Sequence, residues 1–137
     1  MNTSKLIFGT LLGFVGYFMG GFVMYTIVFK DLLASTNPGM TSVQAEPNMI
    51  ALAIGNLAAS FLITYIFEKW AGIRTYLSGA ISGFIIGALI AFSYDCMLLG
   101  TTTLMTWSGV MVDVVVYGLI SAIAGALSGW MLGFKRA

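Results

Sequence analysis

Four continuous runs of apolar residues divide the chain, and polar or charged residues separate them. The runs cover about residues 6–29, 49–67, 76–99 and 108–134. Each is close to the roughly 20 apolar residues that an α-helix needs to cross about 30 Å of hydrocarbon. A transmembrane strand would be shorter and would alternate apolar and polar residues, which these runs do not do. The pattern therefore predicts an all-α fold, with residues 1–137 forming a single integral membrane domain of four transmembrane helices.

The segments between the runs indicate how the helices connect. The first run is longer than the apolar core of a signal peptide, about 7–15 residues, and lacks a small-residue cleavage site, so we expect a retained helix. Residues 30–48 are predicted to form a long outer loop with a turn at Asn37-Pro38-Gly39, and Asn48 is expected to cap the second helix. The links at 68–75 and 100–107 are short, which predicts an antiparallel bundle.

The basic residues predict the orientation of this bundle. One side carries five of the six Lys and Arg residues, and the other side carries Lys30; the five are Lys5, Lys69, Arg74, Lys135 and Arg136. The side that is richer in Lys and Arg faces the cytoplasm. We therefore expect both termini and the link at 68–75 to be cytoplasmic. The bias also argues against a dual-topology dimer.

Composition narrows the function classes further. Of the 137 residues, 59% are hydrophobic and 8% are charged, against about 25% charged residues in a soluble domain. This excludes a soluble enzyme, a disordered tail and a nucleic-acid binder, and it predicts the lipid bilayer as the surroundings of the chain. The sequence has no His, one cysteine (Cys96) and no GxxxxGK[ST] nucleotide motif. We therefore expect no metal site, no cofactor and no enzymatic activity.

Small residues four positions apart recur on three of the predicted helices. The positions that we expect to mediate helix packing are Gly13, Gly79, Gly83, Gly87, Gly118, Gly125 and Gly129. Glycines at this spacing let the backbones of two helices approach closely, and such packing drives helix association in lipid. The alternative is that some of them line a narrow passage or a seam between subunits. Three such faces are more than one helix pair needs, which favours a homo-oligomer or a larger membrane complex.

Two acidic residues fall inside the predicted spans, Asp95 in the third and Asp113 in the fourth. An Asp at the centre of a membrane helix costs about 2.5–3.5 kcal/mol on insertion scales. A helix rises about 1.5 Å per residue, so both acids are expected roughly 6–8 Å below the outer boundary. Two acids at similar depth on neighbouring helices can face each other.

Polar residues at helical spacing continue from these acids. Tyr117 and Ser121 follow Asp113 at intervals of four on the fourth helix, and Asn56 begins a similar stripe on the second helix. We expect Asn56, Tyr117 and Ser121 to join the two acids in a polar path that is reached from outside and narrows inward.

Three interpretations of the acids stay open. They can lie close enough to the interface to be hydrated, or they can pair with Lys30. They can form a proton or cation site, because two close carboxylates in low dielectric repel each other until the pair holds a proton or a cation. The third interpretation is an intramembrane aspartic dyad, but proteases of that kind are larger and carry motifs that this chain lacks.

The function that these residues favour is the passage or coupling of a small cation or proton, in an oligomer. One alternative is a non-transporting accessory or structural subunit of a larger membrane complex. Another is a bundle that binds lipid or a different hydrophobic ligand between its helices.

Two local motifs carry a resemblance to a known family. The first helix contains Phe18-Met19-Gly20-Gly21-Phe22-Val23-Met24-Tyr25 with Phe29 beyond it, and the last contains Asp113-Val-Val-Val-Tyr117-Gly118, followed by Ala122, Gly125 and Gly129. Together with the four spans, the chain resembles a family of small bacterial four-helix membrane proteins that is classed as a domain of unknown function. The Trp that often follows the first helix in that family is absent here. The resemblance implies a bundle in the bacterial cytoplasmic (inner) membrane, and it implies no activity.

Overall fold

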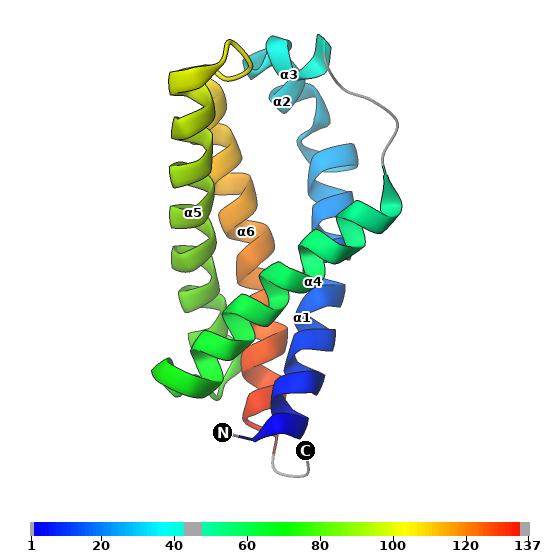
Figure 1. The fold of residues 1–137 in the computed structure, drawn as a ribbon, viewed down its shortest axis with the longest axis vertical. Helices are drawn as coiled ribbons and strands as arrows, with labels where there is room; N and C mark the ends of the chain where they lie inside the picture. Colours follow the sequence, from blue (N-terminus) through cyan, green and yellow to red (C-terminus); the bar gives the residue numbers. More distant parts are fainter. Residues whose placement is uncertain (1, 43–47, 135–137) are drawn as a thin grey trace.

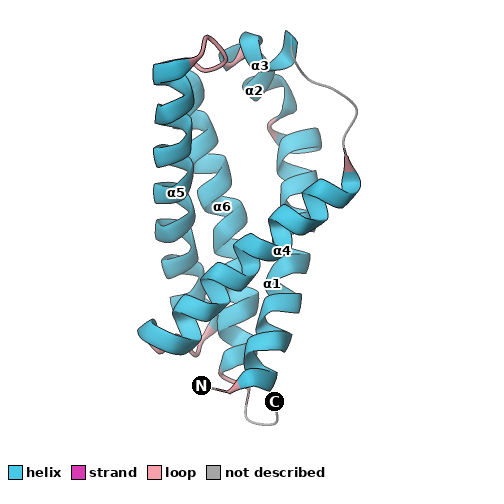
Figure 2. Cartoon of the chain, in the orientation of Figure 1, coloured by secondary structure: helices cyan, strands magenta, loops and turns pink. Residues whose placement is uncertain are grey.

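The computed structural model describes residues 2–42 and 48–134, and every element within these ranges is helical (Figure 2). Four of its helical segments are long and apolar enough to cross a membrane; they are Thr3–Val28, Met49–Ala71, Tyr76–Thr101 and Trp107–Leu132. A helix of 26 residues is about 39 Å long, which exceeds the roughly 30 Å of hydrocarbon. The prediction of an all-helical chain with four such helices is confirmed, and it is compatible with an integral membrane protein.

Two of the four segments combine an α-helix with a π-helical turn. The first consists of α1 (Thr3–Val23) and η1 (Met24–Val28), and the second of α4 (Met49–Ile66) and η2 (Phe67–Ala71). The third is α5 (Tyr76–Thr101) and the fourth is α6 (Trp107–Leu132).

A polar side chain caps the start of each long helix by accepting a backbone N–H; the four caps are Asn2, Asn48, Thr75 and Thr106. Asn48 accepts from the N–H of Ala51 at 3.1 Å, as predicted. Such caps satisfy N–H groups that have no partner within the helix.

The segment between the first two spans differs from the predicted loop. It contains the short helices α2 (Lys30–Thr36) and α3 (Pro38–Ser42), while residues 43–47 lie outside the described part of the chain. The turn predicted around Asn37 falls at the junction of these two helices, where the Asn37 N–H donates to the carbonyl of Leu33 at 2.9 Å. The segment is held in this conformation by hydrogen bonds that Thr106, at the start of α6, donates to Thr36 and Asn37.

The central element of the bundle is α6, which packs against α5 along its length and also against α1 (Figure 1). Helix α4 crosses α1 obliquely and diverges from α5, although only a short link joins α4 to α5 (Figure 1). The short link at 68–75 therefore does not make these two helices packing partners along their length. The start of α1 and the end of α6 lie at the same end of the molecule.

The glycines singled out in the sequence all lie where helices touch. A Cβ atom at Gly79 or Gly83 would overlap the α6 backbone, at the carbonyls of Gly125 and Ser121 respectively. The same applies elsewhere along these contacts; the clashing pairs are Gly87 with the Ser121 hydroxyl, Gly118 with the Phe84 ring, Gly125 with the Gly79 carbonyl, Gly129 with the Thr75 carbonyl, and Gly13 with the hydroxyls of Ser60 and Ser128. These glycines are used for contacts inside one chain, so they supply no argument for a seam between subunits.

Hydroxyl groups join α1, α4 and α6 where the three helices cross. Ser60 donates to the carbonyl of Thr10 at 2.6 Å, and Ser128 donates to that of Gly9 at 3.0 Å. The hydroxyls of Thr64 and Ser128 lie 3.1 Å apart. Ser60, Thr64 and Ser128 are completely buried. We call the region around these residues the packed half of the bundle.

Charged groups connect the helix ends at the end of the packed half that is remote from the cavity. Glu68 pairs with Arg74 at 2.9 Å and accepts a hydrogen bond from the Asn2 N–H at 2.9 Å. The amino group of Lys5 donates to the Leu132 carbonyl at 3.0 Å. Lys5, Lys69 and Arg74 thus lie at one end of the described structure and Lys30 at the other. Lys135 and Arg136 lie outside the described residues.

Candidate functional site

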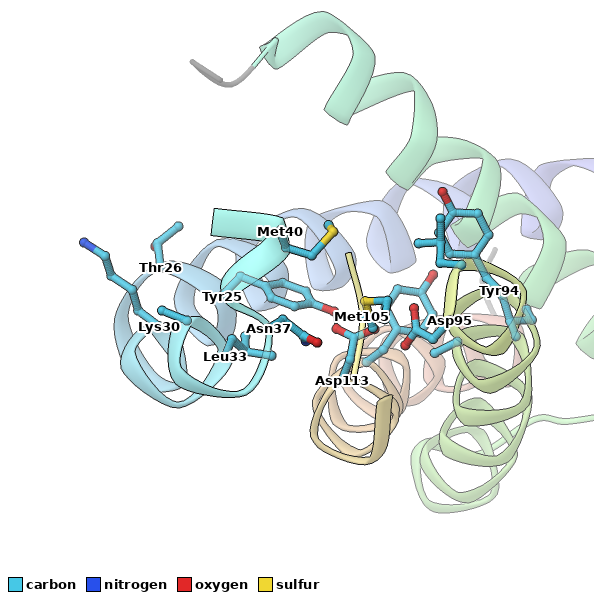
Figure 3. Close-up of a pocket in the computed structure, with 15 residues that line it drawn as sticks. Tyr25, Thr26, Lys30, Leu33, Asn37, Met40, Tyr94, Asp95, Met105 and Asp113 are labelled. Carbon is cyan, nitrogen blue, oxygen red and sulfur yellow. Dashed lines mark hydrogen bonds between the residues drawn. The ribbon is translucent and has the colours of Figure 1, made fainter. Parts of the chain in front are cut away.

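A cavity of about 660 Å³ lies in the other half of the bundle, between η1, α2, α3, α5 and α6 (Figure 3). We call this region the open half. Its floor and walls carry two acids, Asp95 and Asp113, and three tyrosines, Tyr25, Tyr94 and Tyr117. The rest of the lining is mostly apolar. The exposed residues of the rim are Thr26, Lys30, Ala34, Met40, Ile90 and Tyr94.

The two acids come from facing helices and lie at the same depth. Asp95 is six residues before the end of α5 at Thr101, and Asp113 is six residues after the start of α6 at Trp107. Six residues correspond to about 9 Å of helix. The side chains point towards the same space, and their carboxyl groups are close enough to interact electrostatically (Figure 3). The sequence prediction that the two acids can face each other describes this arrangement.

Asp95 is the unusual member of the pair. Only 4% of its surface is exposed. Its Oδ2 atom has no N–H or hydroxyl donor among the described residues, and the facing carboxyl group of Asp113 can share a hydrogen bond with Asp95 only when one of the two acids is protonated. A buried polar group without a partner costs free energy, and a buried charge costs more. A residue that lines the cavity therefore keeps a buried carboxyl oxygen without an N–H or hydroxyl donor in the described structure.

Asp113 is partly buried and has a partner. The hydroxyl of Tyr25 donates to its Oδ1 atom at 2.8 Å. Tyr25 belongs to the π-helical turn η1, in which the Phe29 N–H donates to the carbonyl of Met24, five residues back. Turns of this type widen a helix locally and are frequent at functional sites. No periodicity in the sequence signals the π-helical turn, so the contact between Tyr25 and Asp113 was not predicted.

Lys30 does not neutralise either acid. It lies at the rim of the cavity, and its amino group points away from Asp95 and Asp113 (Figure 3). The ion pair found in the described ranges, Glu68 with Arg74, belongs to the packed half. The interpretation in which Lys30 pairs with the acids is therefore not the arrangement in this structure.

Asn37 anchors α2 and α3 over the cavity. Its side chain is 5% exposed, and its Oδ1 atom accepts from the Thr106 N–H at 3.2 Å. Thr106 in turn donates its hydroxyl to the carbonyl of Thr36, and the Asn37 side chain packs on Gly109, where a Cβ atom would overlap it. The sequence marked Asn37 as a turn residue, and its docking on α6 depends on a tertiary contact that the local pattern does not reveal.

Ser121 lies below the cavity and does not line it. It is completely buried and accepts a hydrogen bond from the hydroxyl of Tyr17 at 3.0 Å. The rings of Tyr17 and Tyr117 lie 6.0 Å apart, so Tyr117 forms the boundary between the cavity and this packed layer. Ser121 is therefore part of the helix contact and not of an open polar path.

Asn56 is also outside the cavity. Its Nδ2 atom donates to the carbonyl of Leu52 in the same helix at 2.8 Å. The structure does not bring Asn56 to the cavity, because α4 crosses α1 obliquely and diverges from α5. Of the five residues predicted for the site, the structure brings three together at the cavity: Asp95, Asp113 and Tyr117.

The site lacks the ligands of a typical metal centre. Within residues 2–42 and 48–134, no three His, Cys, Asp or Glu side chains group together in a way that could hold a metal ion. Cys96 adjoins Asp95 in sequence but does not line the cavity. Comparisons of the chain with models of known protein families, with curated proteins and with solved structures gave no match. The function therefore has to be argued from the geometry of the site.

Proposed function

We propose that this chain is a small integral membrane protein that binds a small cation or a proton at Asp95 and Asp113 and passes it across the membrane or couples its movement to another step. The observation that carries the proposal is Asp95, which lines the cavity opposite Asp113 and whose buried Oδ2 atom has no N–H or hydroxyl donor in the part of the chain that the structure describes. Acids within membrane spans are costly and commonly mark ion or proton pathways. A bound proton or cation would supply what Asp95 lacks.

The proposal includes an antiparallel arrangement with both termini in the cytoplasm. Two observations support it. The contacts of α5 with α6 run in opposite sequence directions, from Gly79 beside Gly125 to Gly87 beside Ser121. Lys5, Lys69 and Arg74 gather at one end, which the positive-inside rule assigns to the cytoplasm. The cavity would then open on the outer side, and the resemblance noted in the sequence suggests the bacterial inner membrane.

Passage across the membrane would need a second conformation. In the described structure the space below Tyr117 is filled by Tyr17 and Ser121, which are 1% and 0% exposed. The packed half below them is closed by helix contacts and hydrogen bonds. A cation bound at the two acids would therefore exchange only with the solution on the cavity side of the membrane until these contacts rearrange.

Flux through liposomes tests the proposal. The purified protein would be reconstituted, and proton and Na⁺ or K⁺ fluxes measured under imposed gradients. We expect flux above that of protein-free liposomes, and its loss in the double variant Asp95→Asn with Asp113→Asn. Asp31→Asn is the matched control, because Asp31 is an exposed acid of α2 that does not line the cavity. Equal flux and proton coupling in the double variant and in the unaltered protein would overturn the proposal.

A second function is favoured by a different part of the molecule. The first three turns of α4 expose apolar side chains on most of their circumference, including Ile50 at 74% and Ile54 at 64%. Lipid can cover such a helix, and so can the helices of another membrane protein or of a second copy. This favours the alternative of an accessory subunit in a larger complex.

Purification in a mild detergent from the native host tests that alternative. An accessory subunit would bring a partner in fixed stoichiometry, and Ile54→Asn would release it. Ile7→Asn on α1 is a control, because Ile7 is a similarly exposed apolar residue on a different helix. Isolation of the chain alone, in both the unaltered and the variant form, would contradict the accessory role.

A further inference from the structure

The shape of the cavity bears on which cation it would take, an argument that rests on the proposed function. Its volume of about 660 Å³ falls within the range of about 300–1,000 Å³ that is usual for small-molecule sites. A single dehydrated ion would leave most of this space empty. The space extends from the acids past Leu33, Leu98 and Met105, so an apolar body can lie beside the charged end.

An inorganic divalent ion is a poor match for the donors present. Calcium takes about six to eight oxygen ligands, and magnesium requires a nearly octahedral set. The cavity offers two carboxylates, and one oxygen of Asp113 already accepts from Tyr25. In the part of the chain that the structure describes, no third acid, Cys or His joins them.

The buried Oδ2 atom of Asp95 would be stabilised more by a ligand that donates a hydrogen bond than by a positive charge alone. Asp95 Oδ2 is buried, and among the described residues the Asp113 carboxyl group, when one of the acids is protonated, is the group that can share a hydrogen bond with Asp95. A protonated amine carries N–H groups that can donate to Asp95 and to the neighbouring Asp113 at once. Charge-assisted bonds of this kind are roughly twice as strong as neutral ones. A quaternary ammonium carries the same charge and has no N–H to donate.

The tyrosines favour an organic cation as well. Tyr25 and Tyr117 line the cavity beside the acids, and the face of a tyrosine ring attracts a cation that lies within about 6 Å of its centre. Met40 and Met105 add flexible thioether side chains, which adapt to ligands of irregular shape. Lys30, the basic residue of the rim, points away from the acids and leaves them uncompensated.

We infer that the ligand of this cavity is a protonated organic amine with an apolar body, whose ammonium group bridges Asp95 and Asp113 by N–H···O bonds. The carboxylates provide the charge and the acceptors. The apolar and aromatic lining between α2, α5 and α6 holds the hydrocarbon part.

Three matched probes distinguish how much the positive charge, the N–H donors and the apolar body of the ligand each contribute to binding affinity. Naphthylmethylamine is fluorescent and protonated at neutral pH, its N-trimethyl derivative keeps the charge without donors, and naphthylmethanol is neutral. Binding would be followed by fluorescence anisotropy with the protein in nanodiscs, with empty nanodiscs as the background. We expect the amine to bind about tenfold or more tightly than either analogue, since hydrogen bonds to charged groups are the stronger ones.

Variants connect that preference to the site. Asp95→Asn is expected to weaken amine binding about tenfold or more, and Asp31→Asn, outside the cavity, is expected to leave it unchanged. Folding of each variant would be checked by helix content and by elution as a single species.

The outcomes distinguish this inference from the proposed function. Equal binding of the amine and its trimethyl derivative would overturn the bridging by N–H groups. If naphthylmethanol bound as tightly as the amine and Asp95→Asn changed neither affinity, the cavity would be an apolar pocket in which the acids play no part. An absence of amine binding together with ion or proton flux that depends on both acids would overturn the amine and leave the proposed function standing. If flux were also independent of the acids, both would fail.

Discussion

In the packed half, three buried hydroxyl side chains bond across helices, whereas in the open half a buried carboxyl group keeps one oxygen without an N–H or hydroxyl donor among the described residues. Ser60, Thr64 and Ser128 are completely buried, and each bonds to a neighbouring helix. Asp95 is nearly as buried and keeps one oxygen unsatisfied. Burial alone therefore does not separate a packing residue from a site residue in this bundle. An unpartnered oxygen does not separate them either, because Thr10 Oγ1 also lacks a partner within the described ranges; what distinguishes Asp95 is that it is an acid facing a second acid across a cavity.

The halves also differ in how closely the helix backbones approach. Glycines bring α5 and α6 together over the packed half, up to Gly87 beside Ser121. Beyond that point α5 presents Ala91 and Asp95 to the cavity. The change from glycine to larger side chains coincides with the place where the cavity begins. Helix packing and the site are thus consecutive parts of one helix face.

The largest expected effect comes from filling the closest contact in the packed half. A side chain at Gly125 would overlap the carbonyl of Gly79, a backbone atom that cannot move without displacing α5. We expect Gly125→Val to lower the free energy of unfolding by at least about 1–3 kcal/mol, the usual cost of overpacking. Unfolding in mixed detergent micelles, followed by helix content, measures it.

Gly55→Val is the matched control for that change. Gly55 also lies in a long helix, α4, but nothing lies within 4 Å of the position of a Cβ atom there. We expect its stability to stay within about 0.5 kcal/mol of the unaltered protein. Equal losses in the two variants would mean that introducing a valine at any helical glycine lowers stability, so that the close contact of α5 with α6 is not the cause, and the contrast between the halves would fail.

An intermediate effect is expected in the open half, at the contact that holds α2 and α3 over the cavity. Asn37→Ala removes the acceptor for the Thr106 N–H, and loss of such a buried partner costs about 1–3 kcal/mol. Helices α2 and α3 should then detach from the start of α6 for a larger fraction of the time, which exposes the cavity. We expect thiol reagents to label Ala91→Cys, in a Cys96→Ala background, roughly tenfold faster when Asn37 is also replaced, because about 1.4 kcal/mol corresponds to tenfold.

Ala91 suits this measurement because it lines the cavity and is 6% exposed. Asn48→Ala provides the control, since it removes the cap of α4 without touching the cavity. Its labelling rate should match that of the starting protein. If Asn37→Ala left the rate unchanged, α2 and α3 would not limit access to the acids.

The smallest expected effect is in the hydroxyl contacts of the packed half. Thr64→Val keeps the shape of the side chain and removes its hydroxyl beside Ser128. Hydrogen bonds between membrane helices average about 0.6 kcal/mol, so we expect a loss of that order in unfolding free energy and no change in flux. A clear change in flux with unchanged stability would show that the packed half takes part in conduction directly.

The sequence predicted what depends on continuous apolar runs and on helix caps. Four long helices and the cap at Asn48 follow from local chemistry, because a helix satisfies its backbone within itself. The pairing of Asp95 with Asp113 was accessible because both acids lie equally far from the ends of their runs. Asn56 was misplaced because the crossing of α4 over α1 depends on which side chains interlock, and a regular stripe along one helix does not determine that.

Three further features could not be predicted, because the local sequence pattern does not contain them. The π-helical turn that directs Tyr25 to Asp113 adds one residue to a turn, and the apolar residues around it do not reveal this change. The role of Asn37 arises from a contact with Thr106, which is 69 residues away in sequence. Ser121 was assigned to a polar path because its hydroxyl was visible in the sequence, while its donor Tyr17 on another helix was not.

The central position of α6 has a consequence for the order in which the protein can be built. During synthesis α6 emerges after α1, α4 and α5, yet it is the main partner of α5 and a principal partner of α1. The earlier helices can form one by one, but until α6 follows, α5 lacks its main packing partner and Asp95 lacks Asp113. The arrival of α6 therefore completes the four-helix packing and the candidate site in the same step, so a nascent chain has no acid pair before α6 has been made.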